Sequence, residues 1–148
     1  MAAIDSIIQQ IQAKGERMTI QRRRVVEALC TASDHLSVSD IAHRIAEHHP
    51  DDPLPETTVY RILQWLKVIA LVSQTDMGSA GIVYELLEHR HHHLICLSCG
   101  QVTHVDDCYL APLRETLLAD FGFRARIDHM AIYGLCPACA RKQITPAP

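Results

Sequence analysis

The stretch HHHLICLSCG, residues 91–100, decides the second half of the fold. Its first part is typical of a β-strand, which runs into a tight C-x-x-C-G turn carrying Cys96 and Cys99. Because side chains two residues apart share one face of a strand, His91 and His93 are expected to point together and His92 away. Three consecutive histidines beside paired cysteines indicate that this segment binds metal.

A second C-x-x-C pair follows near the end of the chain, at Cys136 and Cys139. Two such turns present four sulfurs, enough to close the tetrahedral shell that zinc prefers. A redox role is disfavoured because no βαβ pattern surrounds either pair, and two repeats of the motif make coincidence a poor explanation. We therefore predict a structural zinc ion, which in small peptides contributes about 10–16 kcal/mol to folding.

The histidine run has a carboxylate neighbour in Glu85, which lies on the preceding predicted strand near the junction of the two halves of the chain. A mixed set of imidazole and carboxylate ligands suits Fe²⁺, Mn²⁺, Zn²⁺ or Co²⁺ without selecting among them. The alternative is a solvated polar strand end. An affinity tag is excluded because the run is internal and interrupted.

The whole chain has 148 residues, of which 48% are hydrophobic, and a net charge of −3 at pH 7. No apolar run approaches the roughly 18 residues of a membrane span, and the N-terminus carries no export signal, so we expect a cytoplasmic protein without a membrane partner. In the cytoplasm, six cysteines favour metal binding over disulfides. Cys30, inside a helical pattern, is expected to be a small core residue, and the isolated Cys108 receives no role. The negative charge by itself argues mildly against a nucleic-acid partner.

Residues 1–84 have the element order of a winged helix-turn-helix. Apolar stripes predict helices over residues 4–14, 20–32 and 57–72, the first with Ile4, Ile7, Ile8 and Ile11 on one face and the second with Thr19 as its N-cap. A further helix is expected to start after a capping box of Ser37 and Asp40. Two strands around the turn MGSAG complete a hairpin. On the helix over 57–72, the buried stripe is predicted to be Val59, Ile62, Leu63 and Leu66, and the opposite side carries Thr57, Thr58, Tyr60, Arg61 and Gln64. The alternative is that these helices and the hairpin form some other small α+β domain.

Residues 85–148 are predicted to form a small α/β domain with the four-cysteine zinc site, which makes the fold class α+β. Strands are expected at HHHLICL, QVTHV, FRARI (123–127) and HMAIYGL (129–135). A helix is expected within residues 106–122, with the apolar side chains Leu110, Leu113, Leu117 and Phe121 turned inward.

Enzyme motifs are missing from the sequence. There is no H-E-x-x-H of a zinc peptidase, no H-x-E of a zinc deaminase and no G-x-S-x-G. A catalytic metal site assembled only in three dimensions stays as an alternative. We expect no enzymatic activity and no small-molecule substrate.

The motifs together resemble the ferric uptake regulator (Fur) family of bacterial metal-dependent repressors. The matching segments are GERMTIQR (15–22), TTVYR (57–61), VYEL (83–86), HHHLICLSCG (91–100) and YGLCPAC (133–139), and the resemblance covers about residues 5–142. Ile20 stands where the family usually has Pro, which should leave the fold unchanged. The resemblance implies a homodimer that binds double-stranded operator DNA through a winged helix and pairs through its C-terminal domain.

The resemblance also implies roles for particular residues. The structural zinc maps onto Cys96, Cys99, Cys136 and Cys139, and the regulatory metal site onto His35, Glu85, His91, His93 and His104. His104 replaces a usual carboxylate, which alters the charge of the site. The DNA contacts map onto Tyr60 and Arg61 in the recognition helix, with Arg22 on a phosphate. A third metal site near His89, His92, Asp128 or His129 matches weakly.

We therefore expect a metal-responsive repressor that binds operator DNA as a dimer when its regulatory site holds a divalent metal. Fe²⁺ is the first candidate, with Mn²⁺ or Zn²⁺ as alternatives, and iron homeostasis is the expected role. The alternatives are a zinc- or peroxide-responsive member of the same family, or a zinc-stabilised interaction module that does not bind DNA. Basic residues on the first, second and fourth predicted helices offset the negative net charge where DNA would bind.

Overall fold

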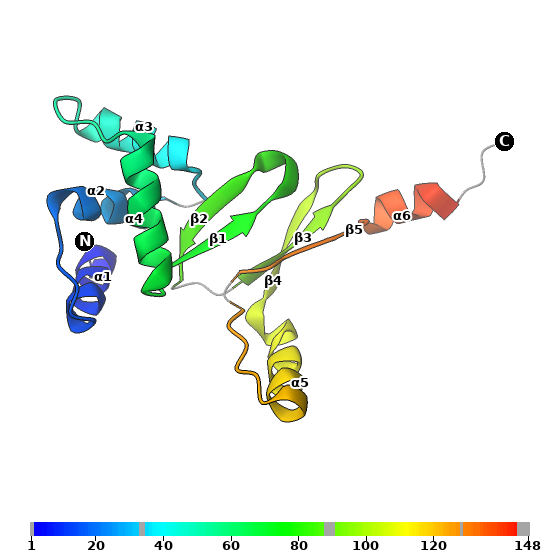
Figure 1. Cartoon of the computed structure of the whole chain (residues 1–148). Helices are drawn as coiled ribbons and strands as arrows, with labels where there is room; N and C mark the ends of the chain where they lie inside the picture. Colours follow the sequence, from blue (N-terminus) through cyan, green and yellow to red (C-terminus); the bar gives the residue numbers. More distant parts are fainter. Residues whose placement is uncertain (1, 33–34, 88–90, 128, 145–148) are drawn as a thin grey trace. The chain divides into compact units, whose positions relative to one another are not determined.

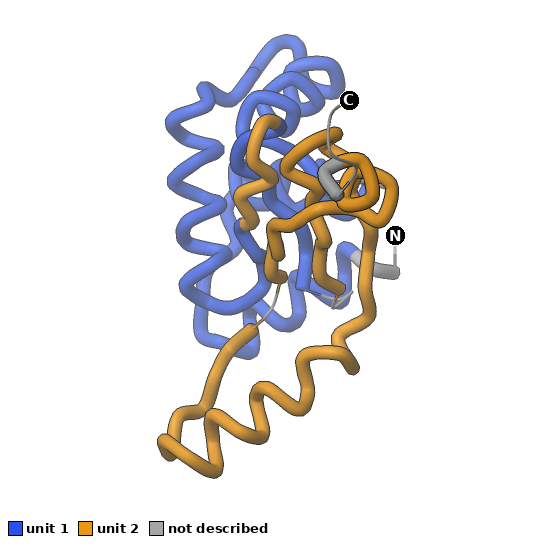
Figure 2. The backbone as a smooth tube through the Cα atoms, turned by 90° about the vertical axis from the view of Figure 1, so that its right-hand side faces the viewer, with its two compact units in different colours: residues 1–74, 80–88 blue, residues 75–79, 89–148 orange. Residues whose placement is uncertain are grey.

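A computed structural model describes residues 2–32, 35–87, 91–127 and 129–144 of the chain. The chain divides into two compact units, which are coloured separately in Figure 2. The first unit is Met1–Gln74 with Ala80–Glu88, and the second is Thr75–Ser79 with His89–Pro148. Each unit is described by itself. Within the described ranges, none of the helices combines the length and hydropathy that crossing a membrane requires.

The first unit contains four helices and a β-hairpin, except for the hairpin residues Thr75–Ser79, which are counted with the second unit (Figure 1). The helices are α1 (Ala2–Ala13), α2 (Ile20–Cys30), α3 (Val38–His48) and α4 (Glu56–Val68). Strands β1 (Val72–Asp76) and β2 (Ile82–Leu86) pair around the short 3₁₀ helix η1 (Gly78–Ala80). This order confirms the winged helix-turn-helix.

Two helix starts are set by side chains that the sequence predicts as caps. Thr19 accepts a hydrogen bond from the backbone N–H of Arg22 at 3.3 Å, which starts α2. At α3, Ser37 and Asp40 form a reciprocal capping box, with N···O distances of 3.1 and 2.9 Å. Both predictions are confirmed, and together they determine where the two helices enter the core.

The core of the first unit is apolar and continuous. The predicted stripe of α4 is buried, and so are the predicted residues Ile7 and Ile11 of α1. Tyr84 of β2 joins this core and pairs with Leu36 through two backbone hydrogen bonds of 2.8 and 3.2 Å. The hairpin is thereby attached to the segment that leads into α3.

The second unit is built on a three-stranded sheet of order β4-β3-β5. Its strands are β3 (His91–Cys96), β4 (Val102–Asp106) and β5 (Ala131–Gly134). Strand β3 pairs antiparallel with β4 and parallel with β5. The other elements are the 3₁₀ helix η2 (Asp107–Tyr109) and the helices α5 (Ala111–Phe121) and α6 (Pro137–Ile144). Helix α6 begins at Pro137, a residue well suited to a first helical position.

The segment 123–127 is not a strand, so that prediction is wrong. Gly122 ends α5 in the left-handed conformation, with φ +62°, and the N–H of Phe123 bonds back to the carbonyl of Leu117 at 3.1 Å. Further on, Arg114 donates to the carbonyl of Ile127 at 2.6 Å. Because a side chain of α5 and the turn of the chain use these backbone groups, the apolar alternation of FRARI does not lead to strand pairing.

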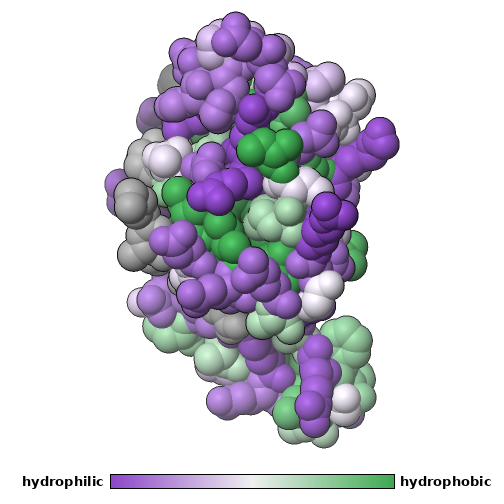
Figure 3. Space-filling model, turned by 90° about the vertical axis from the view of Figure 1, so that its left-hand side faces the viewer, coloured by the Kyte–Doolittle hydropathy of each residue, from purple (hydrophilic) through white to green (hydrophobic). Residues whose placement is uncertain are grey.

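The predicted inward stripe of α5 is also incorrect. Leu113 is 42% exposed and Phe121 is 74% exposed, while Leu110 and Leu117 are only partly buried. No side chain of α5, which is described along its whole length, is buried. Figure 3 shows apolar side chains at the surface of this helix, at the bottom of the view. The 3.6-residue pattern of α5 therefore marks an apolar surface that the single chain leaves open.

Candidate metal centres and nucleic-acid interface

The two C-x-x-C turns meet because β3 and β5 run parallel. Cys96 lies opposite Gly134 in the strand register, so the chain leaves both strands at the same edge of the sheet. Cys99 follows in the turn after β3, Cys136 follows β5, and Cys139 lies in α6. Their four Sγ atoms all lie within 4.8 Å of one another. The structure thus brings together the four cysteines that the sequence predicts.

The sulfur spacing fits a zinc ion. With Zn–S bonds of about 2.3 Å, neighbouring sulfurs of a tetrahedral shell lie about 3.8 Å apart. The Sγ atoms of Cys99 and Cys136 are 3.8 Å apart. None of the chain's six cysteines, all within the described residues, forms a disulfide.

Backbone groups favour the thiolate form at one of these ligands. The N–H of Cys136 points to Cys96 Sγ at 3.3 Å. This N–H and the one of Cys99 lower the pKa of the Cys96 thiol to about 6. A thiolate is the form that binds metal, so Cys96 is prepared as a ligand, whereas the neighbouring cysteine side chains and burial raise the pKa of Cys99 to about 11.

In the first unit, His35 and Glu85 form a close pair, with His35 Nε2 2.7 Å from Glu85 Oε2. The pair follows from the bridge between Leu36 and Tyr84, because each partner lies next to one of these residues in the chain. Both side chains are mostly buried. An imidazole and a carboxylate held together in this way are suitable ligands for a divalent metal.

The second unit gathers histidines on one face of its sheet. His91 and His93 have ring centroids 4.8 Å apart, and His104, the partner of His93 on β4, lies 5.0 Å from each of them. His93 is fully buried, and His104 is exposed. The alternation predicted for the histidine run is confirmed.

His92 points away from this cluster. Its Nε2 lies 2.9 Å from Asp107 Oδ1, and its Nδ1 accepts a hydrogen bond from the N–H of Met130 at 3.2 Å. Arg114 pairs with the same carboxylate. Hydrogen bonds from Arg114 lower the pKa of Asp107, and His92 adds to this effect against the desolvation of the carboxyl.

Both ring nitrogens of His92 therefore have hydrogen-bond partners within the unit. His92 is one of the four candidate ligands for the third metal site suggested by sequence. Two of its other candidates, His89 and Asp128, lie outside the described residues. The fourth, His129, lies beside His91, with its Nε2 3.4 Å from His91 Nδ1. The group of His92, Asp107 and Arg114 has no sequence signature, because its members come from a strand, a 3₁₀ helix and a separate helix.

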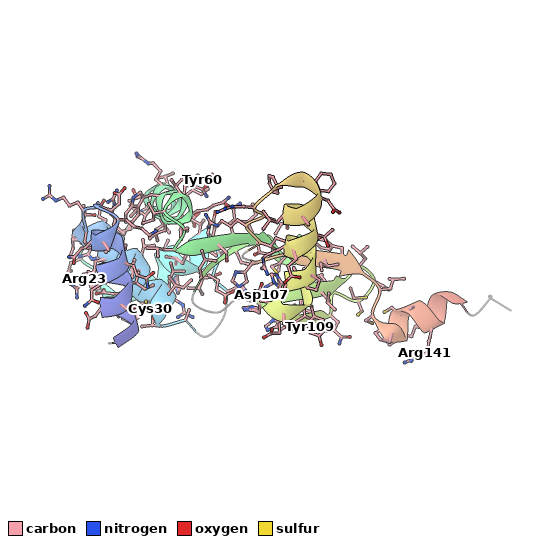
Figure 4. All side chains as sticks on the ribbon, turned by 90° about the horizontal axis from the view of Figure 1, so that it is seen from below. Arg23, Cys30, Tyr60, Asp107, Tyr109 and Arg141 are labelled. Atoms are coloured by element: carbon pink, nitrogen blue, oxygen red, sulfur yellow. The ribbon has the colours of Figure 1, made fainter. Side chains whose placement is uncertain are left out.

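The outer face of α4 carries the candidate DNA contacts. Thr57, Tyr60 and Arg61 are exposed, and Thr58 is partly buried. Figure 4 shows Tyr60 on this helix. Gln64 is used within the unit: its amide nitrogen lies 3.2 Å from Gln74 Oε1 and 3.3 Å from the hydroxyl of Tyr84. Gln64 thus connects the helix to the hairpin.

Arg22 also makes contacts within the first unit. Its guanidinium stacks 3.6 Å above the ring of Trp65 and donates to the carbonyl of Arg17 at 2.6 Å. Glu16 lies 3.5 Å from the same guanidinium. These contacts attach the segment before α2 to the recognition-helix candidate α4, a role that sequence spacing alone does not reveal.

The fold and the sites define a winged-helix protein with a second, sheet-based unit that carries a four-cysteine metal centre and a histidine cluster. Residues 13–133 match the model of the ferric uptake regulator family. The chain is 30% identical over 145 residues to the ferric uptake regulation protein of Bacillus subtilis (strain 168), covering 95% of this chain and 96% of that one. The chain belongs to the ferric uptake regulator family.

Solved structures agree with this assignment. The ferric uptake regulator of Helicobacter pylori matches with a TM-score of 0.65 and 24% identity, over 99% of this chain and 95% of that chain, and supports the fold. A zinc uptake regulator in complex with zinc and DNA matches with a TM-score of 0.60 and 25% identity, over 96% of this chain and 95% of that one.

Proposed function

We propose that this protein is a metal-dependent transcriptional repressor that binds operator DNA as a homodimer, most directly in the control of iron homeostasis. The observation that carries the proposal is the division of the ligand candidates. His35 and Glu85 belong to the winged-helix unit, whereas His91, His93 and His104 belong to the sheet unit. A metal bound by both sets fixes the DNA-binding unit relative to the rest of the dimer.

The DNA-binding surface in this proposal is the exposed face of α4. Thr57, Thr58, Tyr60 and Arg61 face the major groove, with Tyr60 and Arg61 contacting bases and phosphates. Gln64, the remaining candidate, takes part by holding α4 against the hairpin. Arg22, held over Trp65, contributes a phosphate contact from the start of α2. The related zinc uptake regulator was solved with DNA, which supports this use of the fold.

The metals have different roles. Cys96, Cys99, Cys136 and Cys139 hold the structural zinc, which joins the ends of the second unit. The regulatory site takes Fe²⁺ first, with Mn²⁺ and Zn²⁺ as alternatives that its imidazole and carboxylate ligands also accept. Two recognition helices must reach half-sites about one helical turn apart, so a unit that is free to rotate binds the operator weakly. Metal and operator therefore tighten each other's binding.

The homodimer is supported by the apolar surface of the second unit. Several large apolar side chains there are exposed in the single chain: Leu94, Leu97, Val102, Leu113, Leu118, Phe121, Phe123, Ile132, Tyr133 and Leu135. A second copy that covers part of this surface supplies the burial that the unit lacks. We propose that the protein acts in the cytoplasm, on double-stranded DNA, and has neither a catalytic role nor a small-molecule substrate.

The test begins with zinc-loaded protein and a randomised duplex library, selected under anaerobic conditions with Fe²⁺. Binding of the selected duplex is then measured with Fe²⁺, Mn²⁺, Zn²⁺ or no added metal, across a range of salt concentrations. We expect metal-dependent binding that weakens steeply as salt rises, because phosphate contacts release counterions. Binding that does not depend on metal contradicts the regulatory proposal, and failure to enrich any duplex favours the interaction module.

Two variants separate the parts of the proposal. Tyr60→Ala is expected to weaken duplex binding at saturating metal by about 1–3 kcal/mol, while the metal content stays unchanged. His91→Ala is expected to lose the metal response. Wild-type affinity of His91→Ala at saturating metal overturns its assignment to the regulatory site.

A further inference from the structure

The backbone places a fourth histidine on the face that carries His91, His93 and His104. Strands β3 and β5 pair in parallel with His93 opposite Ala131. Continued two residues back, this register sets His129 opposite His91. The intervening residue, Met130, is fixed to β3 because its carbonyl accepts a hydrogen bond from the N–H of His93 at 2.8 Å.

The nitrogen atoms of His129 and His91 approach as two ligands of one ion do. With metal–nitrogen bonds of about 2.0–2.1 Å, neighbouring nitrogens of a tetrahedral shell lie about 3.3 Å apart. His129 Nε2 and His91 Nδ1 are 3.4 Å apart. The distance is long for a hydrogen bond, for which about 2.7–3.2 Å is usual. The same comparison supports zinc at the cysteine cluster.

The ring positions agree with a common centre. Imidazoles that bind one ion have ring centroids separated by about 4.5–5.2 Å for angles between 90° and the tetrahedral value at the metal. The pairs that include His91 have centroid distances of 4.6, 4.8 and 5.0 Å. His93 lies 5.0 Å from His104 and 6.1 Å from His129, the last corresponding to a wider angle. Edge-on packing of aromatic rings reaches similar distances, so the nitrogen-to-nitrogen approach is the discriminating observation.

We propose that His129 is a fourth imidazole ligand, so that the second unit binds a divalent cation by itself, before His35 and Glu85 take part. This inference deepens the proposed regulatory site and rests on the assignment of His91, His93 and His104 made there. An all-imidazole set favours borderline cations such as Zn²⁺, Co²⁺ and Ni²⁺ over the harder Mn²⁺. His104 is exposed and provides the side from which the ion enters.

The test uses Co²⁺, whose visible spectrum reports coordination, added to the full chain with its cysteine site already filled by zinc. His129→Ala is expected to weaken Co²⁺ binding at least about 100-fold, since loss of an outer-sphere partner alone costs 10–100-fold. His43→Ala, at an exposed position of α3, is the matched control and is expected to keep wild-type affinity. Equal Co²⁺ affinity of His129→Ala and wild type overturns the inference.

A second variant guards against a folding defect. His129→Cys is expected to add a sulfur-to-cobalt charge-transfer band in the near ultraviolet, above the wild-type baseline, because the new thiolate replaces the imidazole on the metal. A residue with a purely structural role does not produce this band. Co²⁺ bound by His129→Cys without the band therefore contradicts ligation at this position.

The double variant His35→Ala/Glu85→Ala distinguishes this inference from the proposed function. It is expected to bind Co²⁺ within about tenfold of wild type and to lose metal-dependent duplex binding. Loss of Co²⁺ binding in the double variant overturns autonomous loading by the second unit. If no variant or wild type binds duplex, the regulatory function fails while the Co²⁺ measurements still decide the role of His129.

Discussion

The two units differ in what holds them together. The first unit buries a continuous apolar cluster from all four helices and the hairpin. In the second unit, the fully or nearly buried side chains within the described residues are Thr75, Ile95, Cys96, Cys139, His92 and His93. A conventional core therefore stabilises the first unit, whereas the second unit depends on polar contacts, metal and a partner.

This contrast has a physical reason in size and composition. A small sheet with two short helices has too little apolar interior to offset the entropy of ordering its chain, so metals or oligomers commonly stabilise such units. The second unit places large apolar side chains at its surface instead, including Phe121 and Phe123. It follows that the two units should respond to different perturbations.

Removal of the structural zinc is expected to have the largest effect. In Cys99→Ser, the loss of one ligand should remove most of the folding free energy that structural zinc supplies, which is about 10–16 kcal/mol in small peptides. Amide hydrogen exchange should then speed up throughout β3, β4 and β5 and remain slow in α2 and α4. Cys108→Ser, at an exposed cysteine outside the cluster, is the control. Equal loss of amide protection in both units contradicts the claim that only the second unit depends on zinc.

A cavity in the apolar core is expected to have the next largest effect, and in the opposite unit. Leu63 is fully buried in α4, so Leu63→Ala should destabilise the first unit by about 2–5 kcal/mol. Urea unfolding followed through helix content measures this change, and the zinc content should stay at one ion per chain. Val68→Ala, at a side chain that is 81% exposed, serves as the control. Zinc loss in Leu63→Ala argues against independent units.

Breaking a polar contact should matter more in the second unit than shortening an exposed apolar side chain. Arg114→Gln removes the charge partner of Asp107 and weakens the bond to the carbonyl of Ile127. We expect a loss of about 1–3 kcal/mol, measured by amide exchange in β3. Arg124→Gln, at an exposed arginine, should have little effect. A larger loss for Leu118→Ala than for Arg114→Gln contradicts the polar interpretation.

The capping box of α3 is expected to give the smallest effect, with a defined pH dependence. Hydrogen bonds from the side chain and backbone of Ser37 lower the pKa of Asp40, so the ionised carboxylate stabilises the fold. This contribution is complete above the unfolded value of about 3.9 and disappears as the pH falls through the lower folded value. Asp40→Ala should cost about 0.5–2 kcal/mol at pH 7, and this cost should shrink as the pH falls below the unfolded value and through the lower folded one.

The measurement should follow amides of α3, because acid also protonates the zinc ligands of the second unit. Asp51→Ala, at an exposed aspartate in the loop after α3, is the matched control. A cost for Asp40→Ala that stays constant as acid is added, down to the pH at which the folded carboxyl is protonated, assigns the effect to something other than the charged cap.

Local patterns predicted much of this molecule. The capping residues Thr19 and Ser37, the buried stripe of α4 and the alternation of His91 and His93 each depend on neighbours within one element. The cysteine cluster was also predictable, because four sulfurs in two turns have few other uses. The ligand requirement of zinc connects two turns that are far apart in the sequence, which local periodicity cannot do.

The failures occurred where distant residues decide. FRARI alternates like a strand, but Arg114 bonds to its last carbonyl. Phe121 follows a helical stripe that has no neighbour within the chain to bury it. The stacking of Arg22 on Trp65 was not predicted, because it depends on how α4 packs beside α2. Nothing in the periodicity of a single segment contains such information.

Strand β3 also relates the two metal centres to each other. It carries the clustered histidines at its beginning and Cys96 at its end, in the same register against β5. A slip of one residue in this register would exchange the faces of the strand, turning His92 toward the cluster and His91 and His93 away. In the proposed function, a zinc ion held by Cys96 and Cys136 would prevent that slip, because both strands would end on one ion. The structural metal would then act as a register lock that determines which imidazoles the regulatory metal meets.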